Sequence, residues 1–414
     1  MNTVRRIIAY FPFISILLIV AMFPFRYTEW QRIALYSLAV TYPMDYIVNC
    51  RWQTWRWNVR KGVFVAFCVF ALLTPIWQLM DPLKTDLYQM TINDFAPFFF
   101  VGIAGFLGMT DTIKMEYVAW VMLVVSNIIL GYLIMQTGID FSDIGVWKEA
   151  FWINRTELIN THMVVNLYLN FTLILSTMIL LETRYHWIIK SLTALMMLMP
   201  IGALLFTEGR TGMITFIAFV LILLLYYSIQ NWHWWMLPIV VLFGIGAGIF
   251  LSHNERIQEG YGTTDPRIYL WTVCWEEIAE RPVIGYGVCS ARADFVRRVK
   301  ENKYLKGYVH WIENDSKCNQ NGVIKYDMMH PHNAILESWS RYGIVGLVVC
   351  LLCLLGPLGM RLGKHQLFLS LCALAFLIQA IFESLGSNLQ PIFLTAMVLL
   401  FYSEYVAQTA PSVT

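Results

Sequence analysis

Residues 187–228 read WIIKSLTALMMLMPIGALLFTEGRTGMITFIAFVLILLLYYS, and this stretch decides the fold class. Two apolar runs, 187–206 and 212–228, flank a short polar link that contains Glu208 and Arg210. A membrane-spanning helix needs about 20 mostly apolar residues. The stretch therefore predicts two spanning helices joined by this link.

The rest of the chain repeats this pattern and predicts about twelve spans of the length that a bilayer requires. The candidate spans are residues 7–25, 30–49, 62–80, 94–110, 116–136, 162–181, 187–206, 212–228, 234–251, 342–360, 366–382 and 389–407. Hydrophobic residues make up 58% of the chain and charged residues 14%. These values exclude a soluble globular chain, a disordered chain and a disulfide scaffold. The net charge of +2 gives no basic surface for nucleic acid.

The distribution of Lys and Arg predicts which side each loop occupies. If the N-terminus lies in the cytoplasm, the cytoplasmic segments hold more Lys and Arg than the short outer loops, as in most membrane proteins. The basic start of the first span resembles a signal peptide, but no small-residue cleavage site follows before Arg26, so we expect it to be retained. We expect spans one to nine in 1–251, a long outer loop in 252–341, and spans ten to twelve with a cytoplasmic C-terminus in 342–414.

The long outer loop is predicted to be partly helical. Tyr269 to Arg281 has apolar residues at helical spacing, namely Leu270, Val273, Cys274 and Ile278. Pro282 ends this helix and Gly285-Tyr286-Gly287 forms a turn. A second helix is expected over Ser290–Glu301 with Ser290 as its cap, and a third over Ala334–Arg341 with Asn333 as its cap. The polar stretch 313–322 reads as a loop.

Three cysteines, Cys274, Cys289 and Cys318, fall in the outer loop, where disulfides are allowed. Their number is odd, so at most one bridge is possible, and Cys289–Cys318 is the candidate. The chain has no G-x-x-x-x-G-K-[ST] and no H-E-x-x-H motif. We therefore expect no metal and no cofactor.

Three polar elements lie at the predicted outer surface of the bundle. Arg210 precedes the span at 212–228, and Arg267 opens the helix that follows Asp265 and Pro266. Helix N-termini attract anions, and guanidinium groups bind phosphate through paired hydrogen bonds. His332 follows Pro331, and histidine can accept a proton near neutral pH. Together they suit a substrate with a lipid tail, a pyrophosphate head and a group to be transferred.

Each element also has a structural explanation. Arg210 could be an interface arginine whose stem lies along the membrane, and Arg267 could pair with Asp265 at the surface. His332 could be an interface histidine satisfied by hydrogen bonds. His330 lies two residues away, and we expect its ring to lie on the opposite side from His332.

The set Thr207–Thr211, Arg267-x-x-x-Trp271 leading to Pro282–Gly287, and Pro331-His332-Asn333 with Gly343 and Gly346 resembles the bacterial O-antigen ligase and O-antigen polymerase superfamily. The resemblance implies an all-α polytopic inner-membrane protein with about twelve spans and a large periplasmic loop between spans nine and ten. It implies a nucleotide-independent and metal-independent glycosyltransferase that uses an undecaprenyl-pyrophosphate-linked glycan as donor. For a ligase, the acceptor is a lipid A-core sugar hydroxyl.

In the mechanism implied by this resemblance, Arg210 and Arg267 hold the pyrophosphate and stabilise its departing charge. His332 takes the proton of the acceptor hydroxyl, and direct attack inverts the anomeric carbon. Asn333, Glu383 and His330 are weaker candidates for supporting roles. An O-antigen polymerase using the same donor and a polyprenyl-linked glycan transporter or flippase remain alternatives, although no internal repeat typical of transporters is evident.

Overall fold

The structure is a computed structural model of the full chain, and parts of it are described below. The described residues are 2–25, 28–53, 55, 57, 59–83, 98–100, 102–107, 115–137, 162–206, 210–230, 235–253, 265–314, 319–320, 323–324, 329–359 and 366–382. Glu383 and the predicted twelfth span at 389–407 lie outside these residues.

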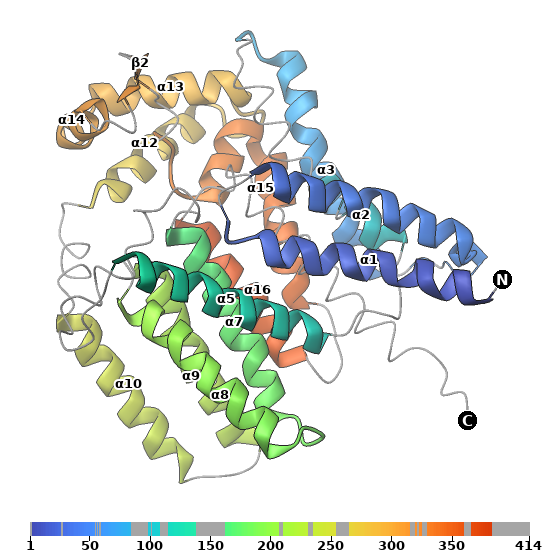
Figure 1. The fold of residues 1–414 in the computed structure, drawn as a ribbon. Coiled ribbons are helices and arrows are strands. Elements are labelled where there is room, and N and C mark those ends of the chain that lie inside the picture. The colour runs from blue at the N-terminus through green and yellow to red at the C-terminus, as the bar shows by residue number, and fades with distance from the viewer. Residues whose placement is uncertain are drawn as a thin grey trace.

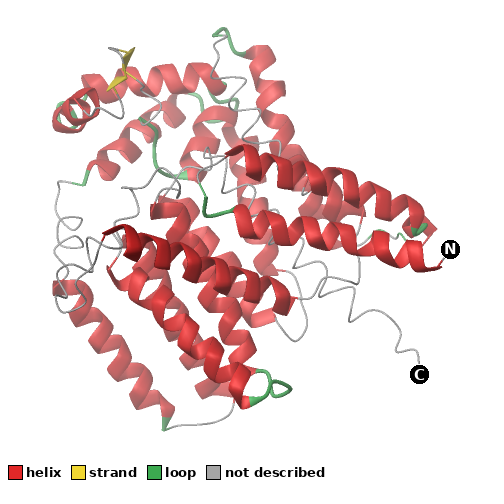
Figure 2. Ribbon diagram, in the orientation of Figure 1, coloured by secondary structure: helices red, strands yellow, loops and turns green. Residues whose placement is uncertain are grey.

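Long apolar helices make up most of the described chain (Figures 1 and 2). They are α1 (Asn2–Met22), α2 (Thr28–Val48), α3 (Val59–Met80), α5 (Met115–Thr137), α7 (His162–Leu181), α8 (Trp187–Phe206), α9 (Arg210–Gln230), α10 (Met236–His253), α15 (Ala334–Gly359) and α16 (Gln366–Phe382). Seven described helices are long and apolar enough to cross a membrane, and four shorter apolar helices accompany them. The chain is therefore an all-α polytopic membrane protein, as the sequence predicted.

Helix α7 lies at the centre of the bundle, where it packs against α5, α8, α9 and α16. In this helix, 83% of the apolar window Val164–Leu181 is buried inside the protein, against 28% for Thr211–Gln230 in α9. A helix that is apolar on all sides and enclosed by neighbours forms the core of a membrane bundle. Helices α1 and α2 pair with each other, and α3 packs along α15.

The loop between α10 and α15 carries its own helical layer, visible at the top of Figure 1. Its elements are α12 (Pro266–Glu280), α13 (Val288–Glu301), α14 (Lys306–Asn314) and the paired two-residue strands β1 (Asn319–Gln320) and β2 (Val323–Ile324). Outside this loop, a 3-10 turn, η1 (Arg51–Gln53), follows α2. The predicted apolar face of α12, namely Leu270, Val273, Cys274 and Ile278, is buried against Phe295 and Val299 of α13. The loop thus has a separate hydrophobic core. Helix α14 was not predicted.

The first turn of α13 is hydrogen-bonded to a residue that lies far away in the chain. Asp81, which follows α3, accepts hydrogen bonds from the backbone N–H of Cys289 at 2.8 Å and of Ser290 at 3.1 Å, and also from the Ser290 hydroxyl. The predicted capping role of Ser290 is therefore wrong, because the helix begins at Val288 with Gly287 as its N-cap, and the buried Asp81 carboxylate accepts the hydrogen bonds of the first turn. This contact fastens the loop layer to the membrane bundle.

Helix α15 is two helices joined at a break. Gly343 has φ +63° and ψ −155°, so the chain turns there between the short outer segment 334–342 and the apolar segment 344–359. A Cβ at Gly343 would lie 2.1 Å from the Val283 carbonyl oxygen, so only glycine fits. The domain boundary expected between 341 and 342 falls beside this break.

The segment 282–287 packs against the break in α15 and forms backbone hydrogen bonds with the residues on both sides of it. The N–H groups of Tyr286 and Gly287 donate to the carbonyls of Ser340 and Arg341, both at 2.9 Å. The Ile344 N–H in turn donates to the Val283 carbonyl at 3.2 Å. We call this contact between 282–287 and 340–344 the glycine junction. It fixes the outer segment of α15 against the loop layer.

Candidate active site

The candidate site is built from the start of α12, from α13 and from the outer segment of α15. Asp265 caps α12: its Oδ1 accepts from the Arg267 N–H at 2.9 Å, and Pro266 occupies the first helical turn. This cap places Arg267 at the positive end of the helix. One turn further, the Trp271 ring lies 6.2 Å from the Phe382 ring at the end of α16.

His332 has an unusual backbone conformation for a residue with a side chain. Its φ is +50°, in the left-handed region. Such strain persists only where the surroundings impose it, and it is frequent at active sites. Asn333, directly after it, accepts hydrogen bonds through Oδ1 from the N–H groups of Ile335 and Leu336, both at 3.0 Å. The predicted cap of α15 by Asn333 is confirmed, and this cap fixes the end of the strained turn.

The rings of His330 and His332 lie together, with centroids 3.9 Å apart. The expectation that they point to opposite sides is wrong, because side chains two residues apart in an extended chain lie on the same face. The His332 backbone N–H donates to Nδ1 of His330 at 3.2 Å. In the neutral ring, Nε2 of His330 therefore carries the proton.

Positive charges surround His330. Burial lowers its pKa well below the usual value, and His332, Arg292, Arg341 and Arg267 lower it further. His330 is therefore neutral around pH 7. Arg292 of α13 and Arg341 of α15 also line a pocket with Pro331, the residue between the two histidines, and Arg267 of α12 acts on His330 electrostatically.

Arg292 and Arg341 are the members of this cluster that sequence reasoning missed. Arg341 is buried and pairs with Glu337, one turn earlier on α15. Two charged residues at the start of an apolar helix were a usable signal for Arg341. Arg292 gave no signal, because α13 is rich in basic residues and only the fold shows which of them faces the site.

Arg210 is the first residue of α9, and its side chain lies outside the described part of the structure. The first turn of α9 is tied to α7, because Asn170 Nδ2 donates to the Gly212 carbonyl at 3.0 Å. Helix α9 packs against α10, whose end leads into the loop layer. The predicted bridge between Cys289 and Cys318 stays a prediction, since Cys318 is also outside the described residues.

The fold and this cluster define a class: a polytopic membrane protein with a cationic histidine site at one end of its bundle. Residues 194–351, which include the whole cluster, match the family described as O-Antigen ligase. A protein of Rickettsia felis named "Putative polysaccharide ligase" is 31% identical over 103 residues, and its counterpart in Rickettsia conorii is 31% identical over 106 residues. Each match covers 24% of this chain and 21% of the relative.

Residues 194–351 of the chain are therefore similar to the O-antigen ligase family, as the motifs indicated. The match spans about a fifth of the length of the curated relatives. The family match at residues 194–351 covers α12, α13 and the outer segment of α15.

Proposed function

We propose that this protein is a glycosyltransferase of the O-antigen ligase type, which moves a glycan from undecaprenyl pyrophosphate to a lipid A-core sugar hydroxyl. One observation carries the proposal: Arg292 and Arg341, from two separate helices, line a pocket with Pro331, which stands between the paired His330 and His332. Arg267 of α12 acts on His330 of this pair electrostatically. Guanidinium groups suit the pyrophosphate of the donor, and a histidine suits the proton of the acceptor. The family match agrees with a polysaccharide transfer.

In this mechanism the arginines bind the donor and stabilise the charge that develops on its leaving pyrophosphate. Arg267 supplies a positive charge from the start of α12, and Arg210 supplies another from the start of α9. His332 removes the proton of the acceptor hydroxyl as the oxygen attacks the anomeric carbon. The C–O bond to the sugar forms as the bond to pyrophosphate breaks, and attack from the opposite face inverts the configuration.

His330 serves as a neutral neighbour of the base in this proposal. Its Nδ1 is occupied by the His332 backbone N–H, so it cannot take a proton there while that bond persists. Asn333 keeps the strained turn in place through its two hydrogen bonds to α15. Glu383 stays a candidate for orienting the acceptor. We place the site on the periplasmic face of the inner membrane, because the excess of Lys and Arg on the other side favours this orientation.

The test is a transfer assay with purified protein, undecaprenyl-pyrophosphate-linked glycan and lipid A-core, without ATP and without added metal. His332→Ala should lower the transfer rate by about 10²–10⁴, the usual contribution of a general base. His310→Ala, at an exposed histidine of α14, is the matched control. A folded His332→Ala protein that transfers at the wild-type rate would remove the base assignment.

The acceptor separates the alternatives. Transfer to lipid A-core supports a ligase, and transfer to a second carrier-linked repeat unit supports a polymerase. Movement of the carrier lipid across the vesicle bilayer without any glycan transfer would contradict the glycosyltransferase interpretation and favour a flippase.

A further inference from the structure

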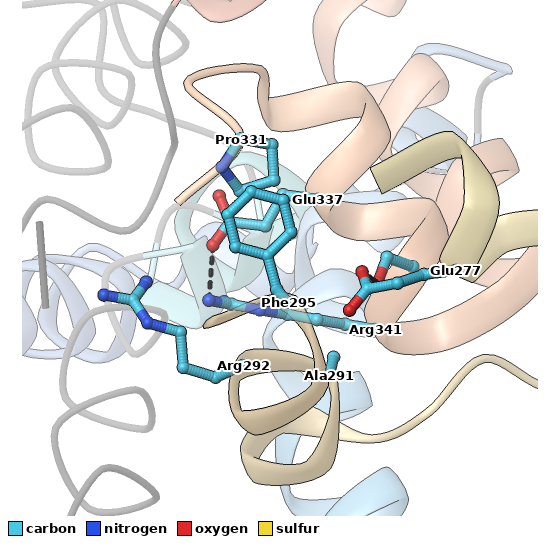
Figure 3. Close-up of a pocket in the computed structure, with 8 residues that line it drawn as sticks. Glu277, Ala291, Arg292, Phe295, Pro331, Glu337 and Arg341 are labelled. Atoms are coloured by element: carbon cyan, nitrogen blue, oxygen red, sulfur yellow. Dashed lines mark hydrogen bonds and ion pairs between the residues drawn. The ribbon is translucent and has the colours of Figure 1, made fainter. Parts of the chain in front are cut away.

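A pocket lies between α12, α13 and α15, directly beside the histidine pair. Its principal lining residues are Glu277, Arg292, Phe295, Pro331, Glu337 and Arg341. Pro331 separates His330 from His332 in the chain, so the pocket adjoins the candidate active site. Figure 3 shows Arg341 extended across the pocket between Glu277 and Glu337, with its ion pair to Glu337 drawn as a dashed line.

Glu277 presents an unsatisfied oxygen in this pocket. The residue is 1% exposed, and its Oε2 accepts a hydrogen bond from the Ser340 hydroxyl at 2.7 Å. Its other oxygen, Oε1, is buried and has no hydrogen-bond partner among the described residues. Leaving a buried polar atom unpaired is costly, and each such atom in a folded protein calls for an explanation. A ligand group in the pocket is such an explanation.

The environment of Glu277 keeps it protonated at neutral pH. Burial raises its pKa to about 8, and Asp294 contributes to the rise, while the Ser340 hydrogen bond, Arg298 and Arg341 oppose it. Because Oε2 accepts from Ser340, the proton is expected on Oε1. Glu277 is therefore a hydrogen-bond donor toward the pocket.

The other titratable and charged groups around Glu277 come from its own helix and the two helices packed on it. They are Cys274 and Glu280 on α12, Arg292, Asp294 and Arg298 on α13, and Glu337 and Arg341 on α15. The pKa of the Cys274 thiol is raised well above its usual value by burial, so it stays neutral. The pKa of Glu280 is lowered by its hydrogen bond to Arg298, so it stays ionised. Neither changes charge near pH 8.

The charges that line the pocket suit an anionic oxygen. Arg292 and Arg341 bring two positive charges and Glu337 one negative charge, and a protonated Glu277 adds none. Guanidinium groups and neutral donors together bind phosphoryl oxygens well. Ionisation of Glu277 would add a repelling charge beside the ligand.

We propose that this pocket is a phosphoryl-binding subsite, in which the carboxylic acid of Glu277 donates a hydrogen bond from Oε1 to an oxygen held by Arg292 and Arg341. The proposal rests on the proposed function and names a further residue for it. Ser340 positions Glu277, and the glycine junction positions Ser340 through the hydrogen bond from the Tyr286 N–H. Glu277 thus couples the fold of the junction to ligand binding.

The test is calorimetric titration of the purified full chain with inorganic pyrophosphate at pH 7 and pH 9. At pH 9 the affinity of wild type for pyrophosphate should be about tenfold or more below that of Glu277→Gln. This factor corresponds to the usual contribution of a hydrogen bond to a charged group. The Gln side chain keeps a donor and cannot ionise. Pyrophosphate itself titrates in this range, so the proteins are compared at each pH.

Glu276→Gln is the matched control, because Glu276 is the exposed neighbour on the same helix. It should behave as wild type at both pH values. Equal alkaline loss in wild type and Glu277→Gln would overturn the proposal. If the Gln variant fails to fold, infrared spectroscopy of wild type replaces it: the band of a protonated carboxylic acid should shift when pyrophosphate binds at pH 7, and an unmoved band would overturn the proposal.

Two arms of the transfer assay distinguish the sources of the phosphoryl group. Glu277→Ala should raise the donor KM about tenfold if the subsite binds the donor pyrophosphate, or the acceptor KM if it binds a phosphate of the acceptor. Either result supports the proposal, and no change in both KM values contradicts it. If only the subsite proposal is wrong, His332→Ala still lowers the transfer rate. If the proposed function is wrong, wild type shows no transfer, although it still binds pyrophosphate.

Discussion

Helix α13 carries arginines in two opposite environments. On its outer side, Arg297 is 54% exposed and pairs with Asp294 at 2.5 Å and with Glu301 at 3.1 Å. On its inner side, Arg292 lines the pocket with the buried Arg341 and Glu337. The outer charges are balanced by acidic neighbours and reached by water. The inner charges are held beside the pocket at a desolvation cost.

This difference separates charges that solvate a surface from charges that the fold retains for a task. Exposed ion pairs contribute about 0–1 kcal/mol to stability, so the outer set explains little. Buried charges are kept against a penalty of several kcal/mol per ion, and a structure without another use for them is better served by apolar residues. The inner set is therefore where we expect substitutions to matter.

The largest effect is expected at the buried ion pair. Glu337→Gln removes the partner of Arg341 and should destabilise the fold by about 3–5 kcal/mol, the usual cost of breaking a buried pair. Thermal unfolding in detergent measures this loss as a drop in Tm. Glu301→Gln, at the exposed pair on α13, is the control, and an equal drop in both would erase the distinction between the two faces.

A pH effect is expected at His330. Its pKa is lowered in the folded protein by burial and by the surrounding cations, so the folded state binds its proton less well than the unfolded state does. Its contribution to stability is therefore complete above about pH 6.5 and is lost as the pH falls below that value toward the lowered pKa.

The measurement is the Tm of wild type and His330→Asn across pH 7.5 to 5, where Asn cannot titrate. Each unit of pKa shift corresponds to about 1.4 kcal/mol, so wild type should lose more stability than the variant over this interval. Identical slopes would mean that His330 is not held in a positive environment, which would weaken the inner cluster as an anion site.

The smallest effect is expected on the KM values when an arginine is replaced on the inner or on the outer side of α13. Arg292→Gln should raise the donor KM about tenfold, because it removes one charged donor of several. Arg297→Gln should leave the donor and acceptor KM values within about twofold of wild type. It should change the free energy of unfolding by no more than the about 0–1 kcal/mol that an exposed ion pair contributes. A larger effect at Arg297 than at Arg292 would reverse the assignment of the faces.

The sequence predicted individual elements better than it predicted their contacts. The apolar face of α12 was evident from the spacing of Leu270, Val273 and Ile278, and Asn333 was recognised as a cap from residue type and position. These are local properties. The cap of α13 was missed because Asp81 is distant in the chain and reaches Cys289 only in the folded protein.

The candidate site divides in the same way. Arg267 and His332 were found because each stands beside a proline and a helix start, where residue type indicates chemistry. Arg292 and Glu277 were not found, because a helix with several arginines or glutamates does not reveal which one faces inward. The orientation of His330 was predicted wrongly, since side chains two residues apart in an extended segment lie on the same face.

Composition and hydrophobic run length alone determined that this chain is a helical membrane protein, because a bilayer accepts few alternatives to apolar helices. Motif residues then indicated the resemblance to the O-antigen ligase superfamily. Only the tertiary structure decided which charges meet. The glycine junction brings Ser340 and Arg341 onto the loop layer by backbone contacts, and such contacts depend on atoms that every residue shares and so leave little trace in the sequence.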